Sequence, residues 1–148
     1  MSEISSIYDT IEDKYIDITK SYLEISDDNM DSALERHTGV FAFFGAVLAH
    51  AKRQLDRREI ELEFFMSQSM ESRRQELQTK GTKVTESALN NYIKSVPKIK
   101  EKKDDVSVAQ HKYNLAKNIV SSLDHQKDML VQMSANKRAE ARMVSDLG

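Results

Sequence analysis

The sequence contains no cysteine, no tryptophan, one proline and only four glycines among its 148 residues. The absence of cysteine excludes disulfides, thiolate metal sites and cysteine nucleophiles. Because few glycines and prolines allow few tight turns, all-β folds and glycine-rich phosphate loops are not expected. The longest apolar stretch, residues 40–49, is much shorter than the roughly 20 residues of a membrane-spanning helix. The first ten residues lack the basic start and apolar run of a signal peptide, so we expect a cytoplasmic protein.

Charged residues make up 31% of the chain and are unevenly divided. Residues 1–35 hold ten acidic and two basic residues, a net charge of -8, whereas the remainder holds 20 basic and 14 acidic residues, a net charge of +6. An acidic segment on a basic body is typical of nucleic-acid-binding and assembly proteins. The same pattern also occurs where a charged face is simply solvated, and that alternative stays open.

The first of two long apolar patterns covers residues 29–79. Its apolar residues recur at alternating steps of four and three, a period of about 3.5 residues that is typical of coiled-coil-like helices. We expect one helix here, with Asp27 or Asp28 as its N-cap and Gly81 just beyond its C-terminal end. The predicted stripe comprises Met30, Leu34, His37, Phe41, Phe44, Leu48, Ala51, Leu55, Arg58, Leu62 and Phe65.

The second long pattern follows Pro97, which suits the first turn of a helix because its missing N–H has no partner there. Its stripe comprises Ile99, Lys102, Val106, Ala109, Tyr113, Ala116, Val120, Leu123, Lys127 and Leu130. Between the two patterns, Thr85 predicts the N-cap of a short helix that ends near Ser95. Residues 15–25 are rich in β-branched and aromatic side chains and partly alternate, which predicts a short strand.

These patterns predict a mainly α fold in which two long helices form a hairpin, with a short connecting helix and a short N-terminal strand. We expect an acidic N-terminal segment over residues 1–28 and a helical hairpin and oligomerisation domain over residues 29–148. Two long helices have too few residues of their own to cover such stripes, so we expect oligomerisation. Arg58, Lys102 and Lys127 interrupt the stripes, as polar residues that fix register in coiled assemblies do. The alternative is an ordinary helical bundle in which these side chains reach solvent.

The polar residues do not form a recognisable catalytic or metal-binding motif. None of the four histidines follows a glutamate by three residues, the spacing that helical di-metal sites use. The glycine at position 81 lacks the upstream glycine and the preceding strand of a phosphate-binding loop. Because no nucleophile, base and orienting group come together, we expect neither an enzyme nor a cofactor.

The basic residues favour nucleic-acid binding, because several come in pairs on the first long helix. Arg53, Arg57 and Arg58 share part of one helix face and form a candidate phosphate-binding ridge. Phe64 is a candidate for stacking on unpaired bases, whereas Phe65 fits the buried stripe better. Glutamates at positions 59, 61 and 63 follow closely, so a salt-bridged surface that binds no DNA is the alternative. The candidate DNA-binding residues are Lys52, Arg53, Arg57, Arg58, Phe64, Arg73, Arg74, Lys80 and Lys83.

Three stretches, residues 13–20, 34–40 and 123–140, together resemble the UvsY-type recombination mediator proteins of phages. The resemblance spans nearly the whole chain in the same order and includes no catalytic signature. A gap-free register aligns Arg58 with a basic residue that contacts DNA in the family, and it places Asp56 where another basic residue is expected. A shifted register instead superimposes Phe64 and Phe65 on a family aromatic pair and places glutamates at the basic positions.

The resemblance implies a protein that binds single-stranded DNA as a homo-oligomer, a hexameric or heptameric ring. Such a protein loads a RecA-like recombinase onto DNA by displacing the single-strand-binding protein or weakening its hold. It has no membrane partner, and it acts in the cytoplasm of an infected bacterial cell if a phage encodes it. The family's C-terminal helix serves assembly, which assigns Tyr113, Val120, Leu123, Leu130 and Met133 to subunit packing. Two alternatives stay open: a helical scaffold or adaptor without DNA binding, and a regulator whose acidic N-terminal segment imitates nucleic acid.

Overall fold

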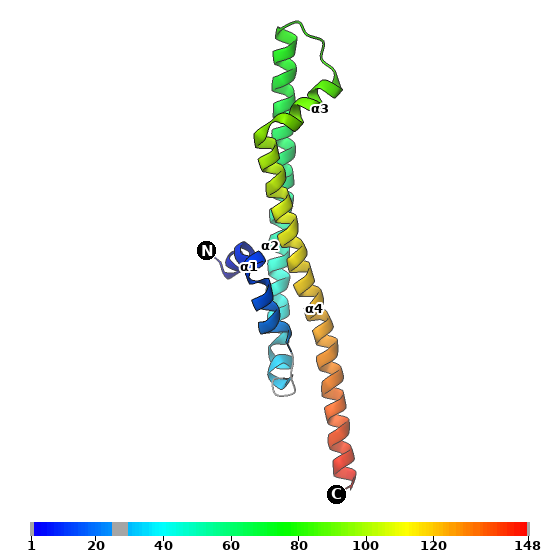
Figure 1. Cartoon of the computed structure of the whole chain (residues 1–148). Coiled ribbons are helices and arrows are strands. Elements are labelled where there is room, and N and C mark those ends of the chain that lie inside the picture. Colours follow the sequence, from blue (N-terminus) through cyan, green and yellow to red (C-terminus); the bar gives the residue numbers. More distant parts are fainter. Residues whose placement is uncertain (1, 25–29, 148) are drawn as a thin grey trace. The chain divides into compact units, whose positions relative to one another are not determined.

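The structure is a computed structural model that describes residues 2–24 and 30–147, which form four helices (Figure 1). They are α1 (Glu3–Leu23), α2 (Met30–Thr79), α3 (Glu86–Ser95) and α4 (Pro97–Leu147). The predicted mainly α class is confirmed, and so are the two long helices and the short helix between them. The candidate N-caps Asp27 and Asp28 lie outside the described residues.

Helix α2 ends at Thr79, just before the predicted glycine. Gly81 has a φ of +71°, in the left-handed region that favours glycine. Its N–H donates to the carbonyl oxygen of Gln78 at 3.0 Å, and the N–H of Thr82 donates to that of Leu77 at 2.9 Å. These two hydrogen bonds form a Schellman motif, which pairs two carbonyl groups that the end of an α-helix leaves without partners.

The short helix α3 begins and ends where the sequence predicts. The Thr85 side chain accepts a hydrogen bond from the N–H of Ala88 at 3.1 Å and caps the first turn. Helix α3 ends at Ser95, and α4 begins at Pro97 after one extended residue, Val96. Because the residue before a proline is disfavoured in the α region, α3 and α4 are two helices and not one.

The predicted strand within residues 15–25 is wrong, because α1 is helical as far as Leu23. Ser2 caps this helix by accepting a hydrogen bond from the N–H of Ser5. Ile11 and Ile18 are seven residues apart, which places them on one helix face, and both are buried. Ile16 is 65% exposed, so the alternation that resembles a strand places only one of its two isoleucines in the core. Burial of the helical face therefore outweighs the β propensity of these residues.

The chain contains two compact units. Unit 1 comprises residues 1–50 and 114–148, and unit 2 comprises residues 51–113. Both long helices pass through both units. The predicted domain boundary at residue 28 stays a prediction.

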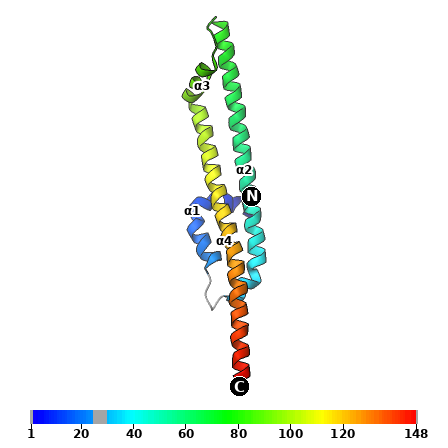
Figure 2. The same ribbon diagram turned by 90° about the vertical axis from the view of Figure 1, so that its right-hand side faces the viewer.

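Unit 1 packs α1 beside the first part of α2 and the second part of α4 (Figure 2). His37 is buried in α2, and its Nε2 lies 2.7 Å from the carbonyl oxygen of Leu123 in α4. The Gln126 side chain donates a hydrogen bond to the carbonyl oxygen of Tyr22 at 2.8 Å, which ties α4 to the end of α1. The buried apolar side chains of this unit include Tyr8, Ile11, Ile18, Ala33, Phe44, Val47, Ala116, Ile119, Leu123 and Leu130.

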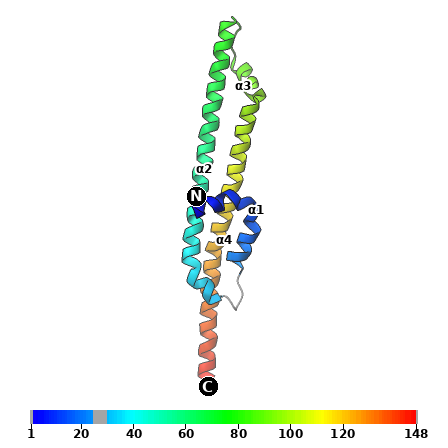
Figure 3. The ribbon, with the colours of Figure 1, turned by 90° about the vertical axis from the view of Figure 1, so that its left-hand side faces the viewer.

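In unit 2 the second part of α2 and the first part of α4 lie side by side with opposite chain directions (Figure 3). Helix α3 connects them and contributes two buried side chains to the core. The buried apolar residues of this unit are Ala51, Leu55, Leu89, Ile93, Ile99 and Ala109.

The buried stripe differs from the predicted one at particular positions. In α2, Ala33 is buried and the predicted Leu34 is 38% exposed. In α4, Gln126 is buried, whereas the predicted polar interruption Lys127 is exposed. A strict seven-residue repeat drifts by about 20° per heptad on a straight α-helix, so the buried position moves to a neighbouring residue.

We expect Leu123→Ala to lower the free energy of unfolding by about 2–5 kcal/mol, because this side chain is fully buried and its loss leaves a cavity. Leu34→Ala is the matched control, and its effect should be much smaller because Leu34 is partly exposed. Urea unfolding followed by circular dichroism measures both. Equal effects of the two substitutions would contradict the observed packing of unit 1.

Candidate nucleic-acid interface

One exposed face of α2 in unit 2 combines basic and large apolar side chains. Arg53, Arg57, Ile60 and Phe64 are spaced by four, three and four residues, so they share one side of the helix. Ile60 is 65% exposed and Phe64 is 64% exposed. We call these four residues the outer face. Sequence reasoning missed Ile60, although its spacing from Arg53 and Phe64 is a signal that could have found it.

The two adjacent phenylalanines differ in surroundings, as the sequence predicts. Phe65 is half-buried, and Lys98 Nζ of α4 lies 5.1 Å from the centre of its ring. Phe64 is on the exposed side of the helix. Of these two rings, therefore, only that of Phe64 is largely open to a ligand.

Glu61 lies beside the outer face and gathers three cations. Its Oε2 is 3.1 Å from Arg58 Nη1 and 3.9 Å from Lys102 Nζ of α4, and its Oε1 is 3.5 Å from Arg57 Nε. The hydrogen bond from Arg58, with the nearby charges of Lys102 and Arg57, lowers the pKa of Glu61. Arg58 and Lys102, two of the predicted polar interruptions, therefore share one carboxylate. We call Glu61, Arg57, Arg58 and Lys102 the Glu61 cluster.

Four more candidate DNA-binding cations also have carboxylate partners. Lys52 lies 2.9 Å from Asp56, and this hydrogen-bonded pairing raises the pKa of Lys52. Glu76 accepts hydrogen bonds from Lys80 and Arg73, which lower its pKa. The corresponding distances are 3.1 Å for Lys80 and 3.2 Å for Arg73. Arg74 lies 3.0 Å from Glu71 and 3.5 Å from Glu86 of α3.

The remaining two candidate cations, Arg53 and Lys83, are exposed and have no carboxylate within 4.0 Å among the described residues. Arg53 belongs to the outer face, and Lys83 belongs to the loop between α2 and α3. An arginine with no intramolecular anion keeps all its donors for a phosphate group. Arg53 and Lys83 are therefore the candidate cations that are least engaged by the protein itself, and of these two Arg53 lies on the outer face.

The candidate oligomerisation residues have different surroundings. Leu123 and Leu130 are fully buried within a single chain, where Leu130 packs with Ala33 and Met133. Val120, Met133 and Tyr113 are half-buried, and Lys52 Nζ lies 5.7 Å from the centre of the Tyr113 ring. Their role in assembly stays a prediction.

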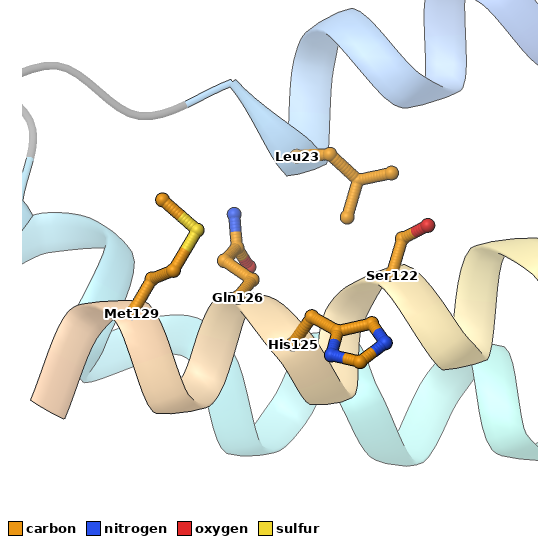
Figure 4. A pocket seen from close by; sticks show the side chains of 5 residues that line it. All are labelled: Leu23, Ser122, His125, Gln126 and Met129. Atoms are coloured by element: carbon orange, nitrogen blue, oxygen red, sulfur yellow. The ribbon is translucent and has the colours of Figure 1, made fainter.

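An open pocket of about 340 Å³ lies in unit 1, lined by Leu23, Ser122, His125, Gln126 and Met129 (Figure 4). Its polar groups are a hydroxyl, an imidazole and an amide that already bonds to Tyr22. Among the described residues, no three histidine, aspartate or glutamate side chains gather as a metal ion would require. Among the described residues that line this pocket, none is an acid that could pair with His125 for proton transfer.

The comparisons with known proteins give no assignment. No protein-family model matches the chain, and neither the curated proteins nor the solved structures include a significant match. Within the described part of the chain, no helix is both long enough and apolar enough to cross a membrane.

We expect stability to fall with acid through Glu61 and Glu76. The pKa of each lies below its ordinary value of 4.5 in the folded chain. The contribution of these two carboxylates to the stability of the folded chain is therefore complete when the pH is above that ordinary value. It is lost as the pH falls through their lowered pKa in the folded state. Thermal unfolding between pH of about 5 and about 3 measures this loss. In the double variant Glu61→Gln and Glu76→Gln, the melting temperature should decline less steeply with acid. The same decline as in wild type would contradict the role of these two carboxylates.

Proposed function

We propose that this protein is a recombination mediator that resembles the UvsY-type proteins. In this proposal it binds single-stranded DNA as a ring-shaped homo-oligomer and helps to load a RecA-like recombinase. It does so by displacing or weakening the single-strand-binding protein. The protein acts without a cofactor and without catalysing a reaction.

The observation that carries this proposal is the outer face of α2. Proteins that bind single strands without sequence preference place cations along the phosphates and aromatic rings against the bases. Arg53 and Arg57 supply the cations, and the exposed ring of Phe64 lies on the same side of the helix. Phosphate contacts and stacking carry little sequence information, so the proposal includes no sequence specificity.

The end of α4 supports assembly. From Ala135 to Leu147 every side chain is exposed. Three of them are large and apolar: Met143, Val144 and Leu147. Subunit contacts would remove this apolar surface from water, which is the main driving force for association. Assembly would also repeat the outer face around a ring, and a weak site becomes an effective one when copies act together.

A second candidate function is a helical scaffold or adaptor that does not bind DNA. The observation that favours it is the pairing of most candidate cations with carboxylates of the same chain. Lys52, Arg57, Arg58, Arg73, Arg74 and Lys80 each lie within 4.0 Å of at least one carboxylate. Exposed pairs of this kind serve solubility and helix stability with no external partner.

The test combines DNA binding, mass and recombinase loading. A fluorescein-labelled oligo-dT should bind with an affinity that falls by about tenfold or more between roughly 50 and 200 mM salt, because each neutralised phosphate releases counterions. Light scattering should give a mass several times the 17.0 kDa of one chain. The protein should also shorten the lag before a RecA-like recombinase hydrolyses ATP on DNA coated with single-strand-binding protein. A monomer that ignores the oligonucleotide would favour the scaffold.

Single substitutions on the outer face identify the contacts. Arg53→Gln should weaken oligo-dT binding severalfold and lower the salt slope by about one, because it removes one phosphate contact. Phe64→Leu should weaken binding about fivefold or more, because a stacking ring is lost while the side chain stays apolar. The controls are Lys127→Gln and Val131→Ala, which change an exposed charged and an exposed apolar side chain of α4, outside the outer face. Equal losses in variants and controls would contradict an interface on this face.

A further inference from the structure

The Glu61 cluster joins two helices through one carboxylate. Arg57 and Arg58 of α2 and Lys102 of α4 all lie within 4.0 Å of Glu61, which is 33% exposed. Among the described ion pairs, one other carboxylate, that of Glu76, is shared by two cations. Its partners are Arg73 of the same helix and Lys80, which directly follows that helix. The cluster is therefore an anion site that the protein's own carboxylate already fills.

A backbone phosphate and a carboxylate use the same donors. Both are oxygen anions that accept hydrogen bonds from guanidinium and ammonium groups. Arg57 belongs both to this cluster and to the outer face, so a strand that follows Arg53, Arg57 and Phe64 reaches the edge of the cluster. With Glu61 in place, three positive charges act on that strand as a net charge of +2.

We propose that Glu61 is an intramolecular competitor of the DNA phosphate, a positioning residue that limits the affinity of this site for single strands. This inference rests on the proposed function. Glu61 holds Arg57 and Arg58 in free protein, and a bound phosphate takes over their donors. The site is thereby kept weak in one subunit and becomes effective only where several subunits meet the same strand. A mediator needs such weak individual contacts, because it must release the strand to the recombinase.

The experiment compares Glu61→Gln with Glu63→Gln by oligo-dT anisotropy at several salt concentrations. Both substitutions remove one negative charge from α2. Of the two residues, only Glu61 is held by ion pairs, because Glu63 has none within 4.0 Å among the described residues. Glu61→Gln should bind about threefold to tenfold more tightly than wild type, as expected for the release of two or three exposed ion pairs. Its salt slope should also be steeper. Glu63→Gln should change affinity by less than about twofold.

A second background tests whether Glu61 acts through its three cation partners. With Arg57→Gln, Arg58→Gln and Lys102→Gln already present, adding Glu61→Gln should change affinity by less than about twofold, because all three cations that it would release are gone. Circular dichroism checks that every variant keeps its helix content. Equal tightening by Glu61→Gln and Glu63→Gln would overturn the inference and leave DNA binding itself intact. Absence of oligo-dT binding in wild type and in both single variants would overturn the proposed function together with this inference.

Discussion

The burial of one narrow apolar face on each long helix is the constraint on which the structure depends. A long helix cannot cover its own apolar side, so every other element is placed where that side needs a partner. In unit 1 the partner is α1, which places Ile11 and Ile18 against the core. In unit 2 it is α3, which contributes Leu89 and Ile93. Buried polar side chains form hydrogen bonds inside the units, as His37 does with the carbonyl group of Leu123.

Much of the fold could be predicted because its signals are local. Gly81 ends α2 through its own backbone conformation, and Thr85 and Pro97 mark helix starts through a cap and a missing N–H. The first helix could not be recognised in this way, because β-branched residues that favour strands there are outweighed by tertiary burial. The choice of Ala33 over Leu34, or of Gln126 over Lys127, depends on helix rotation against neighbours, which a spacing of 3.5 residues does not specify.

The candidate site could be predicted in its composition and in the ion pairs within one helix, but not in the ion pair between two helices. The exposure of Phe64 beside a covered Phe65 follows from helical spacing, and the structure has this arrangement. The pairing of Arg57 and Arg58 with Glu61 is also a matter of spacing along one helix. The contribution of Lys102 is different, because it comes from α4 and depends on the packing of the two helices in unit 2. Long-range contacts of this kind have no signature in the sequence of either helix.

The exposed end of α4 has a consequence for the local dynamics of the chain. Its last thirteen described residues, 135–147, have no side chain in a core, yet they are helical. A free segment of that length is marginal as a helix in water, because the first turn is costly to form. Here that cost is already met, since the segment only extends a helix whose earlier turns are packed, and its alanine, arginine and glutamate residues favour continuation. In a subunit without assembly contacts, protection of backbone amides from hydrogen exchange should therefore decline gradually toward Leu147, so that this segment unwinds and rewinds turn by turn while the packed part of α4 stays intact.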